Sequence, residues 1–252
     1  MSVLMHRQQL RRMLGFILIL CCMLPSGAMA VHLNDHSYMG INYAPFSMLI
    51  LGDSQMAGSG WNRGYANCIL EVYPNAQVLN LAQNGSLLSN GGIYEQWEFY
   101  LSEDLPMPDF ILLDGGVNDL FNLKKEEYDN ESIDLVHASL RSLIEQIHAE
   151  SPDTRIIYTL MPPLVEWEDS EKGPPSYDVQ DIYWKQINII ASAYKYVTVL
   201  DLFSLNPFRF PCKECYKEYF SDSIHLSEAG YRKTFEYLDN ILVVHLAKTL
   251  DD

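Results

Sequence analysis

Basic residues are scarce in this chain of 252 residues. It holds 17 lysines and arginines against 33 aspartates and glutamates, and its formal net charge at pH 7 is −16. A protein that binds nucleic acid or an anionic lipid surface through its overall electrostatic field needs the opposite balance. The acidic residues are spread along the sequence, so we interpret them as a solvated surface and expect no nucleic-acid partner.

Long apolar runs are missing, apart from one near the N-terminus. Three arginines precede an apolar run from Met13 to Leu24, and Ala28-Met29-Ala30 follows it. A membrane-spanning helix needs about 20 apolar residues, so this run is short for a permanent anchor. A basic start, a short apolar run and a small-x-small site are typical of an export signal. We predict a signal peptide over residues 1–30, a domain over residues 31–252, a periplasmic or secreted location, and no stable membrane insertion after cleavage.

Cysteines number only five, and two of them lie in the predicted signal peptide. The three that remain are an odd number, which argues against a disulfide framework. In an oxidising compartment the Cys212-x-x-Cys215 spacing favours a local disulfide, with Cys68 free and buried. The same spacing is half of a zinc site, but the sequence has no second pair of cysteines. We therefore expect no metal and no cofactor.

The sequence contains no internal repeat and no low-complexity tract, and strand-like segments alternate with helix-like ones. This alternation is typical of a parallel sheet with helices on both faces. The predicted strands are Ser47–Leu51, Ala76–Ala82, Asp109–Asp114, Arg155–Leu160 and Val197–Leu202. The predicted helices are Gly64–Tyr73, Ile93–Leu101, Ser132–Ala149, Val179–Tyr194 and Ser227–Leu246. Two stretches, 161–178 and 203–224, fit neither pattern, and loops of such length are often functional.

Gly52-Asp53-Ser54 follows the first predicted strand directly. A nucleophilic serine needs a sharp turn at the sheet edge, and a helix N-terminus behind it stabilises negative charge. Near the C-terminus, Asp222 precedes His225 by three residues. A histidine can take the serine proton, and an acid can fix its tautomer. Each motif alone also fits an ordinary turn or a solvated loop.

Two further polar turns follow predicted strands. Asn84-Gly85-Ser86 comes after the second strand, and Gly116-Val117-Asn118-Asp119 comes after the third. A glycine lets a backbone N–H group approach a ligand closely, and an asparagine amide can donate a hydrogen bond. The ends of parallel strands meet at one edge of a sheet, so we expect these turns to lie near Ser54.

As a set, the four blocks resemble the SGNH hydrolase family, also called GDSL-like esterases and lipases. The resemblance extends from about Ser47 to Tyr231, and Gln55 stands where the family name has leucine. It implies a single-domain three-layer α/β/α sandwich with a five-stranded parallel sheet, the flavodoxin-like SGNH hydrolase fold. It also implies that Asp53 and Asp119 hold the turns of the site together.

The resemblance implies a role for each motif residue. Ser54 is expected to be the nucleophile, His225 the base and Asp222 its orienting acid. The oxyanion hole is expected to consist of the backbone N–H groups of Ser54 and Gly85 and the side chain of Asn118. The expected activity is hydrolysis of carboxylic esters with short acyl chains, through an acyl-enzyme, on a small-molecule or glycan substrate.

Two other functions remain open at this stage. An O-acyltransferase acting on a cell-envelope glycan would use the same serine chemistry with a different acceptor. A catalytically silent binding module would keep the fold without the activity. In the stretch 161–178, Trp167 and Tyr177 are the candidates for substrate binding, because aromatic side chains offer flat surfaces to sugars and acyl chains.

Overall fold

The computed structural model describes residues 45–122, 130–165 and 173–248, so the predicted signal peptide lies outside the described residues. Five parallel strands form one sheet in the order β2-β1-β3-β4-β5. All five predicted strands are confirmed, each end to within two residues. The strands are β1 (Ser47–Leu51), β2 (Gln77–Asn80), β3 (Phe110–Asp114), β4 (Arg155–Leu160) and β5 (Val197–Asp201).

The five predicted helices are also confirmed. They correspond to α3 (Tyr65–Val72), α4 (Gly92–Ser102), α6 (Asn130–Glu150), α7 (Tyr177–Ala191) and α10 (Glu228–Lys248). Ser227 is the N-cap of α10, since its hydroxyl accepts a hydrogen bond from the N–H of Gly230 at 3.2 Å.

Four short helices were not predicted from the sequence. They are α2 (Ser54–Ala57), α5 (Val117–Asn122), α8 (Leu202–Leu205) and α9 (Lys213–Tyr219). The interpretation of residues 203–224 as neither strand nor helix was therefore wrong over α8 and α9. Elements of this length are too short to show a helical period in the sequence.

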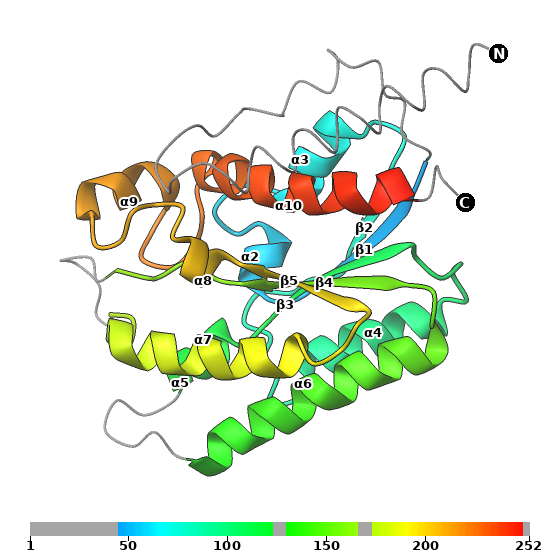
Figure 1. Ribbon diagram of the computed structural model, residues 1–252, viewed down its shortest axis with the longest axis horizontal. Coiled ribbons are helices and arrows are strands. Elements are labelled where there is room, and N and C mark those ends of the chain that lie inside the picture. Colours follow the sequence, from blue (N-terminus) through cyan, green and yellow to red (C-terminus); the bar gives the residue numbers. More distant parts are fainter. Residues whose placement is uncertain (1–44, 123–129, 166–172, 249–252) are drawn as a thin grey trace, which may run out of the picture. The chain divides into compact units, whose positions relative to one another are not determined.

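Helices cover both faces of the sheet. Figure 1 shows α3 and α10 on one face and α4, α6 and α7 on the other. Parallel strands need crossover connections, and here helices supply them. The predicted three-layer α/β/α sandwich is confirmed.

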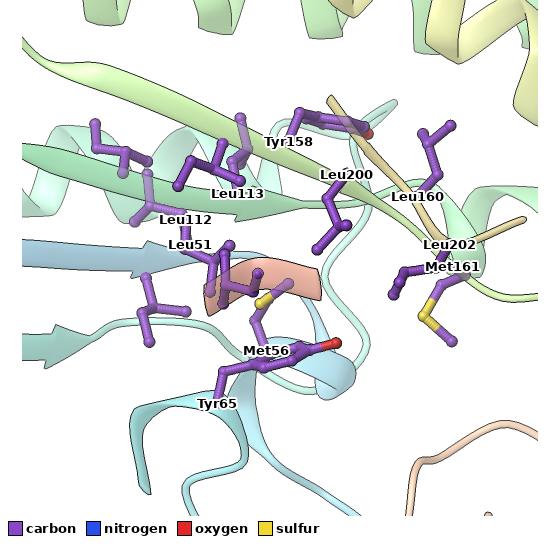
Figure 2. Close-up of a cluster of buried hydrophobic side chains, with 14 of the residues drawn as sticks. Leu51, Met56, Tyr65, Leu112, Leu113, Tyr158, Leu160, Met161, Leu200 and Leu202 are labelled. Carbon is purple, nitrogen blue, oxygen red and sulfur yellow. The ribbon is translucent and has the colours of Figure 1, made fainter. Parts of the chain in front are cut away.

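The core lies on the two faces of the central strands. Residues of β1, β3 and β4 are buried almost throughout, which agrees with their continuous runs of isoleucine and leucine. Figure 2 shows part of this core, with Leu51, Leu113 and Tyr158 on three neighbouring strands and Met56 on α2. Burying one such aliphatic side chain stabilises the fold by about 1.5–3 kcal/mol.

The order in which successive strands are added to the sheet changes direction at β1. The chain passes from β1 to β2 on one side and later returns to β3 on the other. Leu51 at the end of β1 is in register with Leu113, so the turns that follow β1 and β3 leave the sheet side by side. In open α/β sheets, ligands bind outside the carboxyl ends of the strands at such a switch point.

Candidate active site

Ser54 is the first residue of α2 and directly follows the turn that leaves β1. Gly52 has a φ of 151° there, and a Cβ at this position would collide with Oδ1 of Asp114. The turn therefore requires glycine at position 52. Asp53 is the N-cap of α2, and its carboxylate accepts a hydrogen bond from the N–H of Gln55 at 2.9 Å.

A chain of hydrogen bonds joins Ser54, His225 and Asp222. The Ser54 Oγ to His225 Nε2 distance is 2.9 Å, and the His225 Nδ1 to Asp222 Oδ2 distance is 2.6 Å. Ser54 and His225 are 171 positions apart in the sequence, so only the fold brings them together. The side chain of His225 is 25% exposed, which leaves it accessible from solvent.

The other oxygen of Asp222 accepts two backbone hydrogen bonds, from Ile224 at 2.8 Å and from His225 at 2.7 Å. Burial raises the pKa of the Asp222 carboxyl, but the hydrogen bonds from His225 and Ile224 outweigh it and hold the pKa below its ordinary value. Asp222 therefore stays ionised over the pH range in which a histidine can act as a base.

Asn118 and Gly85 lie at the same edge of the sheet. The half-buried Asn118 amide donates to the carbonyl of Ser86 at 2.9 Å. Gly85 has a φ of 80°, and no heavy atom lies within 4 Å of the position that a Cβ would take. The backbone around Gly85 is thus open on that side, as a close approach to a ligand requires.

Gln96 of α4 joins these turns, although no sequence motif marks its role. Its amide accepts from the N–H of Gly52 at 2.9 Å and donates to the carbonyl of Gly52 at 2.8 Å. The same Nε2 donates to the hydroxyl of Ser86 at 3.1 Å. Gln96 lies 44 positions from Gly52, and contacts at such separation cannot be read from a single sequence.

The predicted roles of Asp53 and Asp119 in holding the turns are confirmed. Asp53 caps α2, and Asp119 accepts from the N–H groups of Leu88 at 2.9 Å and Ser89 at 3.0 Å. Asp119 thereby ties the turn after β3 to the loop that contains Gly85.

Gln55, which stands in place of leucine in the family motif, connects α2 to the loop that carries His225. Its side-chain amide donates to the backbone carbonyl of Ile224 at 2.7 Å. The backbone carbonyl of Gln55 accepts from the hydroxyl of Tyr231 at 2.6 Å. A leucine side chain makes no such hydrogen bond.

Of the two candidate substrate-binding residues, Trp167 lies outside the described residues. Tyr177 begins α7, and its ring stacks against Phe203 and Phe210 with centroid distances of 5.2 and 4.6 Å. Its side chain is 39% exposed, so a partly open aromatic surface exists here. Whether Tyr177 contacts a substrate stays a prediction.

The predicted disulfide between Cys212 and Cys215 is confirmed, and so is the free, buried Cys68. In the part of the chain that the structure describes, no cluster of three or more histidine, cysteine, aspartate or glutamate residues could hold a metal ion. Among the described helices, none is long and apolar enough to cross a membrane.

Comparisons with known proteins identify the family and the fold. A family model described as the GDSL-like Lipase/Acylhydrolase family matches residues 50–233. No curated protein matches the chain.

Several solved structures share the fold. A protein from Lactobacillus plantarum has a TM-score of 0.63 and 21% identity, covering 81% of this chain and 99% of its own. A protein described as a GDSL-like lipase from Parabacteroides merdae has a TM-score of 0.58 and 19% identity, with coverages of 77% and 94%. An acetylxylan esterase from Geobacillus stearothermophilus has a TM-score of 0.55 and 21% identity, with coverages of 78% and 96%.

Proposed function

The chain belongs to the GDSL-like Lipase/Acylhydrolase family of ester-hydrolysing enzymes, and we propose that it is a serine esterase with Ser54 as its nucleophile. One observation carries the proposal, the hydrogen-bonded chain from Asp222 through His225 to Ser54. A serine hydroxyl is a weak nucleophile until a base takes its proton, and a histidine held by a carboxylate is suited to that role.

The reaction starts with the Nδ1 hydrogen of His225 donated to Asp222, which leaves the Nε2 lone pair for the hydroxyl of Ser54. Ser54 Oγ attacks the ester carbonyl while its proton moves to Nε2. The tetrahedral intermediate collapses, the C–O bond to the alcohol breaks, and His225 returns the proton to the departing alcohol. Water then adds to the acyl-enzyme with its proton going to His225, and the acid is released as Ser54 regains its proton.

The negative oxygen of the intermediate needs hydrogen-bond donors at the same edge of the sheet. We assign this role to the backbone N–H groups of Ser54 and Gly85 and to the amide of Asn118. The positive φ and open surroundings of Gly85 and the half-buried amide of Asn118 support the assignment. Donors fixed before the reaction stabilise the developing charge without reorganisation.

The proposed substrates are carboxylic esters with short acyl chains on a small molecule or a glycan. The solved relative named an acetylxylan esterase removes acetyl groups from a polysaccharide, as its name states, and this supports the same substrate class here. The proposed place of action is the periplasm or the extracellular medium, after removal of residues 1–30.

Hydrolysis of p-nitrophenyl acetate tests the proposal directly. Ser54→Ala should reduce kcat by at least about 10⁴-fold, because loss of the nucleophile removes the acyl-enzyme route. Ser102→Ala is the matched control, since Ser102 is exposed at the end of α4 and its hydroxyl bonds only to the carbonyl of Phe99. A folded Ser54→Ala protein with wild-type activity would disprove the assignment.

A further inference from the structure

Two buried carboxyl groups lie directly behind the nucleophile. Asp53 immediately precedes Ser54, and Asp114 is the last residue of the neighbouring strand β3. Their exposed fractions are 0% and 1%. The N–H of Asp53 donates to Oδ1 of Asp114 at 3.3 Å, and the same oxygen packs against Gly52, where no side chain fits. The two carboxyls and the nucleophilic turn thus form one packed unit.

Most donors around this pair bond to other acceptors, although the buried hydroxyl of Thr159, in register with Asp114 on β4, has no hydrogen-bond partner among the described residues. Oδ1 of Asp53 accepts from the N–H of Gln55, while Oδ2 is buried and has no donor. Three buried tyrosines interact electrostatically with the pair, and each hydroxyl donates to another acceptor. The hydroxyl of Tyr158 donates to the carbonyl of Gly115, that of Tyr65 to Thr234, and that of Tyr231 to the carbonyl of Gln55.

Charged side chains near the pair do not neutralise it. Among the described residues, no lysine or arginine forms a hydrogen bond or ion pair with either carboxyl. His225 and Asp119 act on Asp53 through space, and their effects oppose each other. On the side of Gly52 where Asp114 lies, the fully buried side chain of Met56 also packs.

Two carboxylates that both carry a charge are costly in such a place. Each loses its hydration on burial, and each repels the other. Burial is the largest effect and raises the pKa of Asp53 to about 7, while burial and the charge of Asp53 raise the pKa of Asp114 well above its ordinary value. Adjacent carboxyls avoid this cost when one proton serves both of them.

We propose that Asp53 and Asp114 hold one proton between them in the folded enzyme, and that this proton fixes the turn that carries Ser54. With the proton in place, the buried pair carries a single negative charge instead of two. Asp114 is then a positioning residue. It does not touch the reacting atoms but holds the turn from which Ser54 projects.

The proposal fixes the sign of a pH effect on stability. In the unfolded chain both carboxyls ionise near their ordinary pKa, whereas the folded protein retains a proton up to about pH 7 or beyond. Between these limits the unfolded state binds fewer protons, so the free energy of unfolding falls as the pH rises. Wild-type protein should therefore lose stability through this window because the pair resists ionisation.

Asp114→Asn tests this with a side chain of the same shape. Its amide oxygen still accepts from the N–H of Asp53, and it carries no charge, so the pair needs no bound proton to avoid a double negative charge. The Tm difference, variant minus wild type, should increase by about 3 °C or more between pH 5 and pH 8. A shift of one pKa unit has roughly this effect on the Tm of a domain of this size. Asp53→Asn should show the same trend and serves if Asp114→Asn folds poorly.

Asp239→Asn is the control, because Asp239 is a buried carboxyl of α10 that accepts from the hydroxyl of Tyr73, outside the pair. Its Tm difference from wild type should not grow with pH in this way. Infrared spectroscopy gives a direct readout, since wild-type protein at pH 7 should show the band of a protonated carboxyl that Asp114→Asn lacks.

Parallel Tm curves for wild type and both pair variants, or the absence of the protonated-carboxyl band, would overturn the proposal. The proposal rests on the proposed function only for the role of the Ser54 turn. The Tm and infrared measurements need no substrate. They can therefore contradict the shared proton while the Ser54→Ala experiment supports the esterase, or support it while that experiment fails.

Discussion

Asn118 has one amide hydrogen that its observed contact does not use. The side-chain amide carries two hydrogens, and one is donated to the carbonyl of Ser86. That contact fixes the direction of the amide, so the second hydrogen is presented at the edge of the sheet. A donor held in this way acts on a charge that develops nearby and contributes little to binding an uncharged ester.

Asn118→Ala should therefore lower kcat by about 10²–10³-fold and leave KM almost unchanged. Steady-state kinetics with p-nitrophenyl acetate measure both constants. Asn118→Asp supplies a control of equal size that lacks the donor, and it should lose activity as well. If KM rises while kcat holds, Asn118 binds substrate and does not serve the oxyanion.

Single residues differ in how far the sequence predicts them. Ser54, Asp222 and His225 belong to short motifs whose chemistry is recognisable, and the fold brings them within hydrogen-bond distance. Asp114 and Gln96 carry no such motif. Their roles depend on contacts 61 and 44 positions away, so only the packed structure identifies them.

At the scale of elements, α2 and the loop that carries His225 are held together by Gln55. The hydrogen bond from its amide to the carbonyl of Ile224 fixes the peptide group next to His225. Gln55 itself is 1% exposed, which limits alternative partners from solvent. The distance between Ser54 and His225 thus depends on a side chain that touches neither reacting atom.

Gln55→Leu should lower kcat by up to about tenfold with KM little changed, because a hydrogen bond contributes about 0.5–1.5 kcal/mol and its loss loosens the histidine loop. Steady-state kinetics with p-nitrophenyl acetate measure kcat and KM and check this. Gln55→Glu keeps the length but removes the donor when ionised, so it should also lose kcat. A variant that loses stability but keeps kcat would show that Gln55 only packs.

The elements also show where sequence patterns stop being informative. The strands were predicted closely because their buried runs are continuous and each is bounded by turn residues. Helix α9 was missed since it is only seven residues long and lies in an aromatic stretch. Its N-cap is Cys212, whose sulfur accepts from the N–H of Cys215, and it buries Tyr216, whose hydroxyl donates to the carbonyl of Pro163. Tertiary contacts of this kind leave no period in the sequence.

At the scale of the whole molecule, the disulfide and the proposed export support each other. Disulfides persist in oxidising compartments and are rare in the cytosol. The bridge between Cys212 and Cys215 is therefore consistent with the proposed export. Cys68 is buried, and burial raises the pKa of its thiol to about 12, so it should stay reduced in the folded protein.

We therefore expect full-length chain expressed in a secretion-competent bacterial host to begin at Val31 and to be found outside the cytoplasm. Mass spectrometry of the intact protein gives the N-terminus. Alkylation of the unfolded protein without reductant should modify one cysteine, Cys68, and alkylation after reduction should modify all three. Ala30→Arg places a large cation at the predicted cleavage site, so this variant should retain residues 1–30 and stay with the membrane fraction. Wild-type protein that keeps its N-terminus in the cytoplasm, with all five cysteines reactive before reduction, would contradict both the export and the compartment inferred from the disulfide.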